Sequence, residues 1–166
     1  MDLMTSERDL DFDPLDVVEQ VVIGEQYVYE RTEDRELHMA IPGQWCDHQI
    51  WFAWKPDMEM LHVCLSLDVK APKARRPDIC DLVALLNERL WIGHFDVWAE
   101  DGAIVYRHSL VLPDGEQPSP AQIAHFVAHA VEAGERFHPA FNYLVWGGKT
   151  PHEAAEAALF ETAGEA

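Results

Sequence analysis

The amino-acid sequence predicts an α+β domain in which helices pack on an antiparallel β-sheet. Segments with the two-residue alternation of strands follow one another directly, and helical periodicity occurs before, between and after them. The predicted order is one helix, three or four strands, a second helix, a hairpin and then two helices. This order lacks the strict strand–helix alternation of doubly wound parallel sheets, so an antiparallel sheet is favoured.

The size and charge of the chain limit what kind of protein it can be. It has 166 residues, of which 48% are hydrophobic and 25% are charged, a composition typical of one globular domain. We expect this domain to span residues 13–162, between a flexible acidic N-terminus at 1–12 and a flexible end at 163–166. The formal net charge of −18 argues against nucleic acid and anionic membranes as partners, because both are bound by Lys and Arg.

Cysteine usage and the N-terminal sequence indicate a cytoplasmic protein. The three cysteines show no CxxC spacing, so we expect no disulfide framework and a reducing compartment. Cys80 lies beside Ile79 in a helical stripe and is expected to be a small buried residue. The first residues lack the basic and apolar regions of a signal peptide, and no apolar stretch approaches the length that spans a bilayer.

The first half of the chain predicts one helix followed by strands. Asp13-Pro14 is typical of a helix start, and apolar residues at helical spacing continue to about Gly24. The turn Lys55-Pro56-Asp57-Met58 separates the two strongest strand candidates. Segments rich in β-branched and aromatic residues predict strands at 27–31, 37–41, 45–54 and 61–69.

A second helix and a hairpin follow. Pro72 opens a helical region whose apolar stripe begins at Ile79, and Gly93 is predicted to end it. Strands at 95–100 and 103–112 then flank Asp101-Gly102, a strong hairpin signal.

The expected register of this hairpin brings opposite charges together. If Asp101-Gly102 forms a two-residue turn, Trp98 faces Val105 and Asp96 faces Arg107. Asp96 and Arg107 are therefore candidates for a structural ion pair across the strands, worth at most about 1 kcal/mol if exposed.

Two capping boxes predict the last two helices. Ser119-Pro120-Ala121-Gln122 begins a long helix that extends to Trp146, and Thr150-Pro151-His152-Glu153 begins a short one. Pro139 lies within the long helix and should kink or interrupt it, because proline lacks the donor of the helical hydrogen bond.

Four residues on two predicted strands have the chemistry of zinc ligands. Cys46 shares a face with His48, and His62 shares a face with Cys64, since each pair is two residues apart. The core-facing residues are even-numbered in the first strand and odd-numbered in the second, and paired strands bury the same face. This register places the two pairs on opposite faces, so we predict no metal site and no cofactor.

The remaining polar groups do not form a pattern that indicates catalysis. His125 and His129 share a helix face, where they could bind a metal or line a solvated side. No nucleotide-binding, nucleophile-elbow or zinc-protease motif is present, and no catalytic residue is predicted. A basic cluster is either ordinary surface or a site for an acidic segment, and it consists of Lys70, Lys73, Arg75 and Arg76.

Large aromatic residues exceed what one sheet layer can bury. A sheet with helices on one side buries half of each strand, yet both faces of residues 45–54 carry large apolar groups. Core packing accounts for some of them. The surplus indicates a second covered face, because exposed apolar patches mark interaction sites. The candidate residues for a partner or dimer interface are Trp51, Trp91 and Trp98.

At residues 86–98 (LNERLWIGHFDVW), followed by Asp101-Gly102 and Tyr106-Arg107-His108, the chain resembles the YbjN family. Trp45-Cys46-Asp47, the helix entry at 72–76 and Pro139-Ala140-Phe141 fit the same pattern, and the resemblance covers residues 14–160. It implies a fold like that of the type III secretion chaperones, commonly dimeric, in proteins described as bacterial sensory transduction regulators. The resemblance carries over no catalytic residues.

The expected function is therefore to bind another protein, as a chaperone-like or regulatory homodimer without catalytic activity. The alternative is an enzyme of unknown reaction, with a pocket built from scattered His, Asp and Arg side chains. A concave pocket with converging polar groups would favour the enzyme, and a flat or grooved apolar surface would favour the binding module.

Overall fold

The computed structural model describes the main chain of residues 13–163 and the side chains up to Phe160. It confirms the predicted α+β fold and element order, with four strands ahead of the second helix. The predicted flexible N-terminus at 1–12 and residues 164–166 of the predicted flexible end at 163–166 lie outside the described residues. Ala163, the first residue of that predicted end, is instead the last residue of α4. The elements are α1 (Leu15–Gly24), β1 (Val28–Thr32), β2 (Glu36–Ile41), β3 (His48–Lys55), β4 (Met60–Lys70), α2 (Arg76–Asn87), β5 (His94–Val97), β6 (Ala103–Val111), α3 (Pro120–Val145) and α4 (Pro151–Ala163).

The six strands form one antiparallel sheet in the order β1-β2-β3-β4-β6-β5. The first four strands follow the chain order. After α2 the chain enters the far edge as β5, and β6 then returns between β5 and β4. In the pairing of β3 with β4, Phe52 lies opposite Val63 and Trp51 lies opposite Cys64, so these two pairs point to opposite faces.

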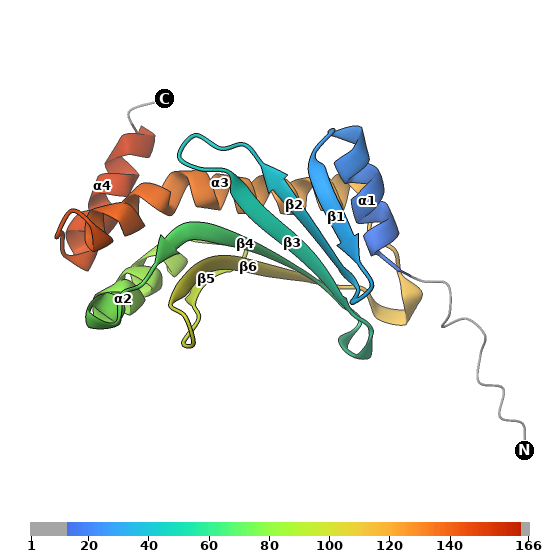
Figure 1. Cartoon of the computed structure of the whole chain (residues 1–166), viewed down its shortest axis with the longest axis horizontal. Helices are drawn as coiled ribbons and strands as arrows, with labels where there is room; N and C mark the ends of the chain where they lie inside the picture. The colour runs from blue at the N-terminus through green and yellow to red at the C-terminus, as the bar shows by residue number, and fades with distance from the viewer. Residues whose placement is uncertain (1–12, 164–166) are drawn as a thin grey trace, which may run out of the picture.

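The helices gather on one side of the sheet (Figure 1). The long α3 runs along this side and contacts β4 and β6, with α1 at one end against β2 and β3. At the other end α2 packs against β5, and α4 packs on α2 and α3. One face of the sheet is therefore covered by helices, and the other carries no helix of residues 13–163.

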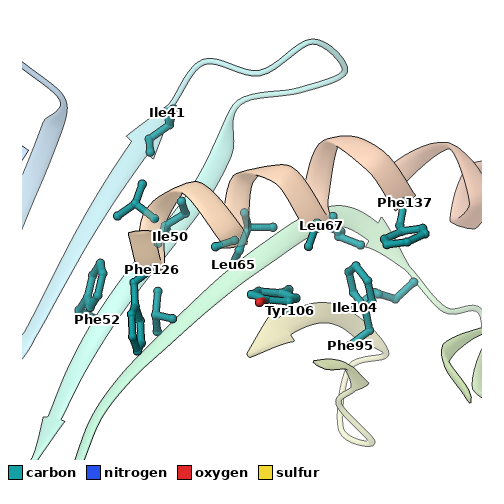
Figure 2. Close-up of a cluster of buried hydrophobic side chains, with 14 of the residues drawn as sticks. Ile41, Ile50, Phe52, Leu65, Leu67, Phe95, Ile104, Tyr106, Phe126 and Phe137 are labelled. Atoms are coloured by element: carbon teal, nitrogen blue, oxygen red, sulfur yellow. The ribbon is translucent and has the colours of Figure 1, made fainter. Parts of the chain in front are cut away.

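The hydrophobic core fills the layer between α3 and the sheet, as Figure 2 shows. Phe126 and Phe137 of α3 lie over strand residues such as Phe52 and Tyr106. Every second residue of β4, from Leu61 to Val69, is buried in this layer. The alternation predicted for the two strongest strands is thus confirmed. A register shift of one residue would turn the apolar side chains of such a strand away from the core.

The second helix ends earlier than the sequence indicates. It stops at Asn87 rather than near Gly93, because the Asn87 side-chain amide hydrogen-bonds to the main chain of β5. Asn87 Oδ1 accepts the Phe95 N–H at 2.7 Å, and Asn87 Nδ2 donates to the Phe95 carbonyl at 3.0 Å. Residues 88–93 form a loop, which places Trp91 outside the helix.

The register of the β5–β6 hairpin is wrong by two residues in the sequence prediction. Asp96 pairs with Val105, and the loop contains four residues, 99–102, closed by the bonds Trp98 N–H to Ala103 O and Gly102 N–H to Trp98 O. The loop docks on the rest of the chain, since Ala71 N–H donates to the Gly102 carbonyl at 2.8 Å. This contact lies outside the hairpin, so the two-residue turn rule could not anticipate it.

Both predicted capping boxes are present. Ser119 Oγ accepts the Gln122 N–H while the Gln122 side chain accepts the Ser119 N–H, and Thr150 and Glu153 make the same reciprocal bonds. Two other expectations differ from the structure. Cys80 on α2 is exposed to solvent rather than buried. Pro139 does not interrupt α3, which continues to Val145.

Candidate functional site

The candidate site is the face of the sheet that no described helix covers, called here the outer face. Because side chains alternate along each strand, this face takes the residues left over from the core-facing set. Across the middle of the sheet one row runs over five strands through consecutive register pairs. Its members are His38, Trp51, Cys64, Arg107 and His94.

An aromatic cluster occupies the centre of the outer face. Trp51 on β3 stacks on His38 with ring centroids 6.4 Å apart, and the Trp98 indole meets Trp51 edge-on at 5.8 Å. Trp98 directly follows β5, and strands β4 and β6 lie between β5 and β3, which carries Trp51. The rings must therefore reach across these two strands to meet, and we call His38, Trp51 and Trp98 the aromatic cluster.

The aromatic cluster shields the residues beneath it from water. Cys64 on β4 and Val105 on β6 point to the outer face, yet both are fully buried. Trp98 itself is 40% exposed and Trp51 is half-buried. The outer face thus combines a dry centre with an exposed aromatic surface, which is the usual arrangement of an interaction patch.

A polar network borders the aromatic cluster. Arg107 Nη1 donates to Asp96 Oδ2 at 3.1 Å, and Arg107 Nε donates to His62 Nε2 at 3.5 Å. With Nε2 accepting, His62 Nδ1–H donates to Ser109 Oγ at 2.8 Å. The Asp96–Arg107 ion pair is therefore a diagonal contact between neighbouring register pairs rather than a directly opposed one.

Burial controls the titration of these groups. It lowers the pKa of His62 to about 4, with the positive charge of Arg107 as a further cause, so the imidazole is neutral at physiological pH. Burial also raises the pKa of the Cys64 thiol to about 12. The thiol form therefore dominates, and Cys64 contributes packing rather than a nucleophilic thiolate.

A second polar cluster lies on the helix side, where the β2–β3 loop meets α3. Glu135 Oε1 accepts the Gln44 N–H at 2.8 Å and the His48 Nε2–H at 2.6 Å. His48 is fully buried, on the core-facing side of β3. The Glu135 main-chain carbonyl accepts the Trp45 indole N–H at 3.2 Å.

This cluster explains why Pro139 is tolerated inside α3. Proline at position 139 cannot donate to the carbonyl four residues earlier, which belongs to Glu135. Trp45 supplies the missing donor from the β2–β3 loop. The cluster therefore holds the β2–β3 loop against α3 and has a structural role.

The zinc-type residues do not converge. His48 faces the core, whereas His62 and Cys64 face outward, as the register argument predicts, and Cys46 lies in the loop before β3. His125 and His129 do stack on each other along α3, with ring centroids 6.1 Å apart. Within the described residues no group of three or more His, Cys, Asp or Glu side chains is arranged to hold a metal ion.

The three candidate tryptophans separate into two places. Trp51 and Trp98 meet on the outer face, but Trp91 lies in the loop after α2 and is 100% exposed. Sequence reasoning missed His38 as an outer-face residue, although the two-residue alternation of its strand contains that information. It also missed Glu135, because nothing in the sequence links a helix carboxylate to a loop 90 residues away.

Comparisons with known proteins agree with the fold. A family model described as "YbjN: Putative bacterial sensory transduction regulator" matches residues 14–142. A crystal structure described as "YbjN, a putative transcription regulator from E. coli" matches with a TM-score of 0.51 and 12% sequence identity, over 72% of this chain and 84% of that chain. At this identity the likeness shows the fold alone. A search of curated proteins found no match. None of the described helices is long and apolar enough to cross a membrane.

Proposed function

The chain belongs to the YbjN family, and from that membership we propose that it is a non-catalytic regulatory module that binds another protein on its outer face. We propose further that it acts as a homodimer in the cytoplasm, in a chaperone-like manner. The observation that carries the proposal is the aromatic cluster on the sheet face that no helix of the described residues covers.

The chemistry of the outer face suits a protein partner. Exposed tryptophan is strongly enriched among the residues that dominate binding energy, and its large ring loses little conformational freedom on binding. Asp96 and Arg107 stand beside the aromatic cluster as partly exposed charges that can fix the orientation of a partner. Because the whole chain carries a formal net charge of −18, nucleic acid and anionic membranes are disfavoured as partners.

Site-specific crosslinking in the native cell would test this assignment. A photoreactive amino acid at Ser66, an outer-face residue between Gln49 and Val105, should capture a defined partner protein. The same amino acid at Glu156, exposed on α4, serves as the control position. Mass spectrometry of the crosslinked bands identifies the partner.

Substitution of the aromatic cluster gives the decisive comparison. Trp51→Ala with Trp98→Ala should abolish the crosslink from Ser66, whereas Trp146→Ala, another largely exposed tryptophan, should leave it unchanged. Capture that is equal from Ser66 and Glu156, or that survives the double substitution, would contradict binding at the outer face.

A further inference from the structure

Trp91 lies on the helix side of the molecule and is unusually exposed for a tryptophan. It is the most exposed large hydrophobic residue in the described part of the chain, at 100%, and it lies in the loop that precedes β5. It borders a cavity of about 200 Å³ together with α3 residues such as Glu132 and Arg136. A tryptophan that makes so little contact with its own chain contributes nothing to the core, so its large apolar ring is available to another surface.

An apolar groove lies on the other flank of α3. It has a volume of about 420 Å³ and is formed between α1 and α3, with Val21, Tyr27, Val127 and Val131 among its walls. Its carboxylates are Glu25 and Glu132. A groove with aliphatic walls and an acidic rim fits an occupant that is apolar and carries a positive charge.

The loop with Trp91 is such an occupant. Arg89 lies two residues before Trp91 and is exposed, so the loop presents a cation beside a bare indole ring. The loop also carries the exposed Glu88, so its two charges balance, whereas the whole chain has 12 Lys and Arg residues against 30 Asp and Glu. The loop is therefore less negative than the rest of the chain. The chain's own residues 1–12 fit the groove less well, because they hold four acidic residues and one arginine.

The positions of loop and groove on α3 favour a symmetric pair. The α3 residues of the groove and those beside Trp91 are centred roughly 140° apart around the helix, at about 100° per residue. A two-fold axis along α3 therefore sets the loop of each copy opposite the groove of the other. Ala124 and Ala128, which line the groove and are both exposed, have small side chains that allow the two copies to approach each other closely.

We propose that a second copy of this chain covers both features, with Trp91 of each copy entering the α1–α3 groove of the other. Arg89 then lies near Glu25 on the acidic rim of the opposite copy's groove, while Glu132 borders the cavity of Arg89 within its own copy. The inference rests on the proposed homodimer and specifies its interface. It leaves the outer face free, so that dimerisation and partner binding use opposite sides of the molecule.

Light scattering coupled to size exclusion tests this interface over a concentration series. At tens of micromolar the wild type should show twice the monomer mass of 18.9 kDa. Trp91→Ala should raise the dissociation constant about 30-fold, as expected for a central interface tryptophan. Ala128→Glu, which places a charge in the groove on an exposed helix position, should have a similar effect. Trp146→Ala, on the far end of α3, is the matched control and should leave the mass unchanged.

A second measurement shows the contact directly. Trp91→Cys on one copy and Ala128→Cys on a tagged copy, both with Cys80→Ser, should form a mixed disulfide on oxidation in preference to either homodimer. Thermal unfolding verifies that each variant is folded. A wild-type mass of one chain would overturn both this interface and the proposed homodimer. A dimer that persists in Trp91→Ala and Ala128→Glu, or dissociates only with Trp51→Ala and Trp98→Ala, would overturn this interface alone.

Discussion

Glu135 fastens the β2–β3 loop to α3 with its carboxylate and its main-chain carbonyl together. The carboxylate accepts hydrogen bonds from His48 and Gln44, and the main-chain carbonyl accepts one from the Trp45 indole. The carbonyl bond exists because Pro139 leaves that acceptor without its helical donor. A single proline in the helix is thus tied to a single indole in a distant loop.

This dependence predicts an energetic coupling between Trp45 and Pro139. Trp45→Phe should lower the free energy of unfolding by about 1 kcal/mol, because the Glu135 carbonyl loses its donor. In a Pro139→Ala background the new N–H can donate to the same carbonyl, so Trp45→Phe should have a smaller effect. Urea unfolding of the four proteins measures the coupling. Equal losses in both backgrounds would show that the indole bond and the proline are unrelated.

His62 predicts how stability depends on pH. Its pKa is about 4 in the folded chain and 6.5 when unperturbed, so between these values the unfolded state binds a proton that the folded state does not. The stabilisation present above pH 6.5 is therefore lost as the pH falls towards 4. His62→Gln should reduce this loss, while His152→Gln, at an exposed position on α4, should not. Unfolding by urea at pH 7, 6, 5 and 4.5 gives the slopes, and identical slopes for wild type and His62→Gln would contradict the assignment.

At the scale of elements, the sequence correctly predicts the features that depend only on neighbouring residues. The two capping boxes and the alternation of β3 and β4 depend on residues within one turn or one strand, and they are found as expected. The end of α2 and the β5–β6 register depend on contacts from elsewhere, namely Asn87 with Phe95 and Gly102 with Ala71. For the candidate site, sequence reasoning found Trp51 and Trp98 but could not show that they meet across two strands.

The docking of the β5–β6 loop can be tested with two glycines that have the same φ angle. Gly102 and Gly115 both have φ of +75°, but a Cβ at Gly102 would lie 2.5 Å from the Ala71 carbonyl oxygen, whereas Gly115 has nothing within 4 Å. Gly115→Ala should lower the unfolding free energy by about 1 kcal/mol through backbone strain alone. Gly102→Ala should lower it further, because the loop must also move away from Ala71. Equal losses in denaturant unfolding would mean that the loop does not depend on this contact.

At the scale of the whole molecule, the sheet separates two surfaces of different character. The outer face presents the aromatic cluster beside the Asp96–Arg107 pair, and the helix side presents Trp91 and the α1–α3 groove. If each surface has its own occupant, substitutions on one side should not change binding on the other, because independent sites far apart behave additively. Under that condition the proposed partner would bind to the outer face without dissociating the proposed dimer.

The net charge predicts the salt dependence of the proposed dimer. Two chains of −18 repel each other, and the repulsion is screened beyond about 8 Å at 0.15 M salt but only beyond about 30 Å at 0.01 M. Apolar burial of Trp91 does not weaken at low salt, so the balance between the two terms is set by the ionic strength. We expect the dimer to persist at 0.15 M salt and to dissociate increasingly towards 0.01 M. Sedimentation equilibrium at both salt concentrations, with wild type and Trp146→Ala, gives the dissociation constants. A dimer that tightens at low salt would mean that attraction between Arg89 and the acidic groove rim outweighs the repulsion of the whole chains.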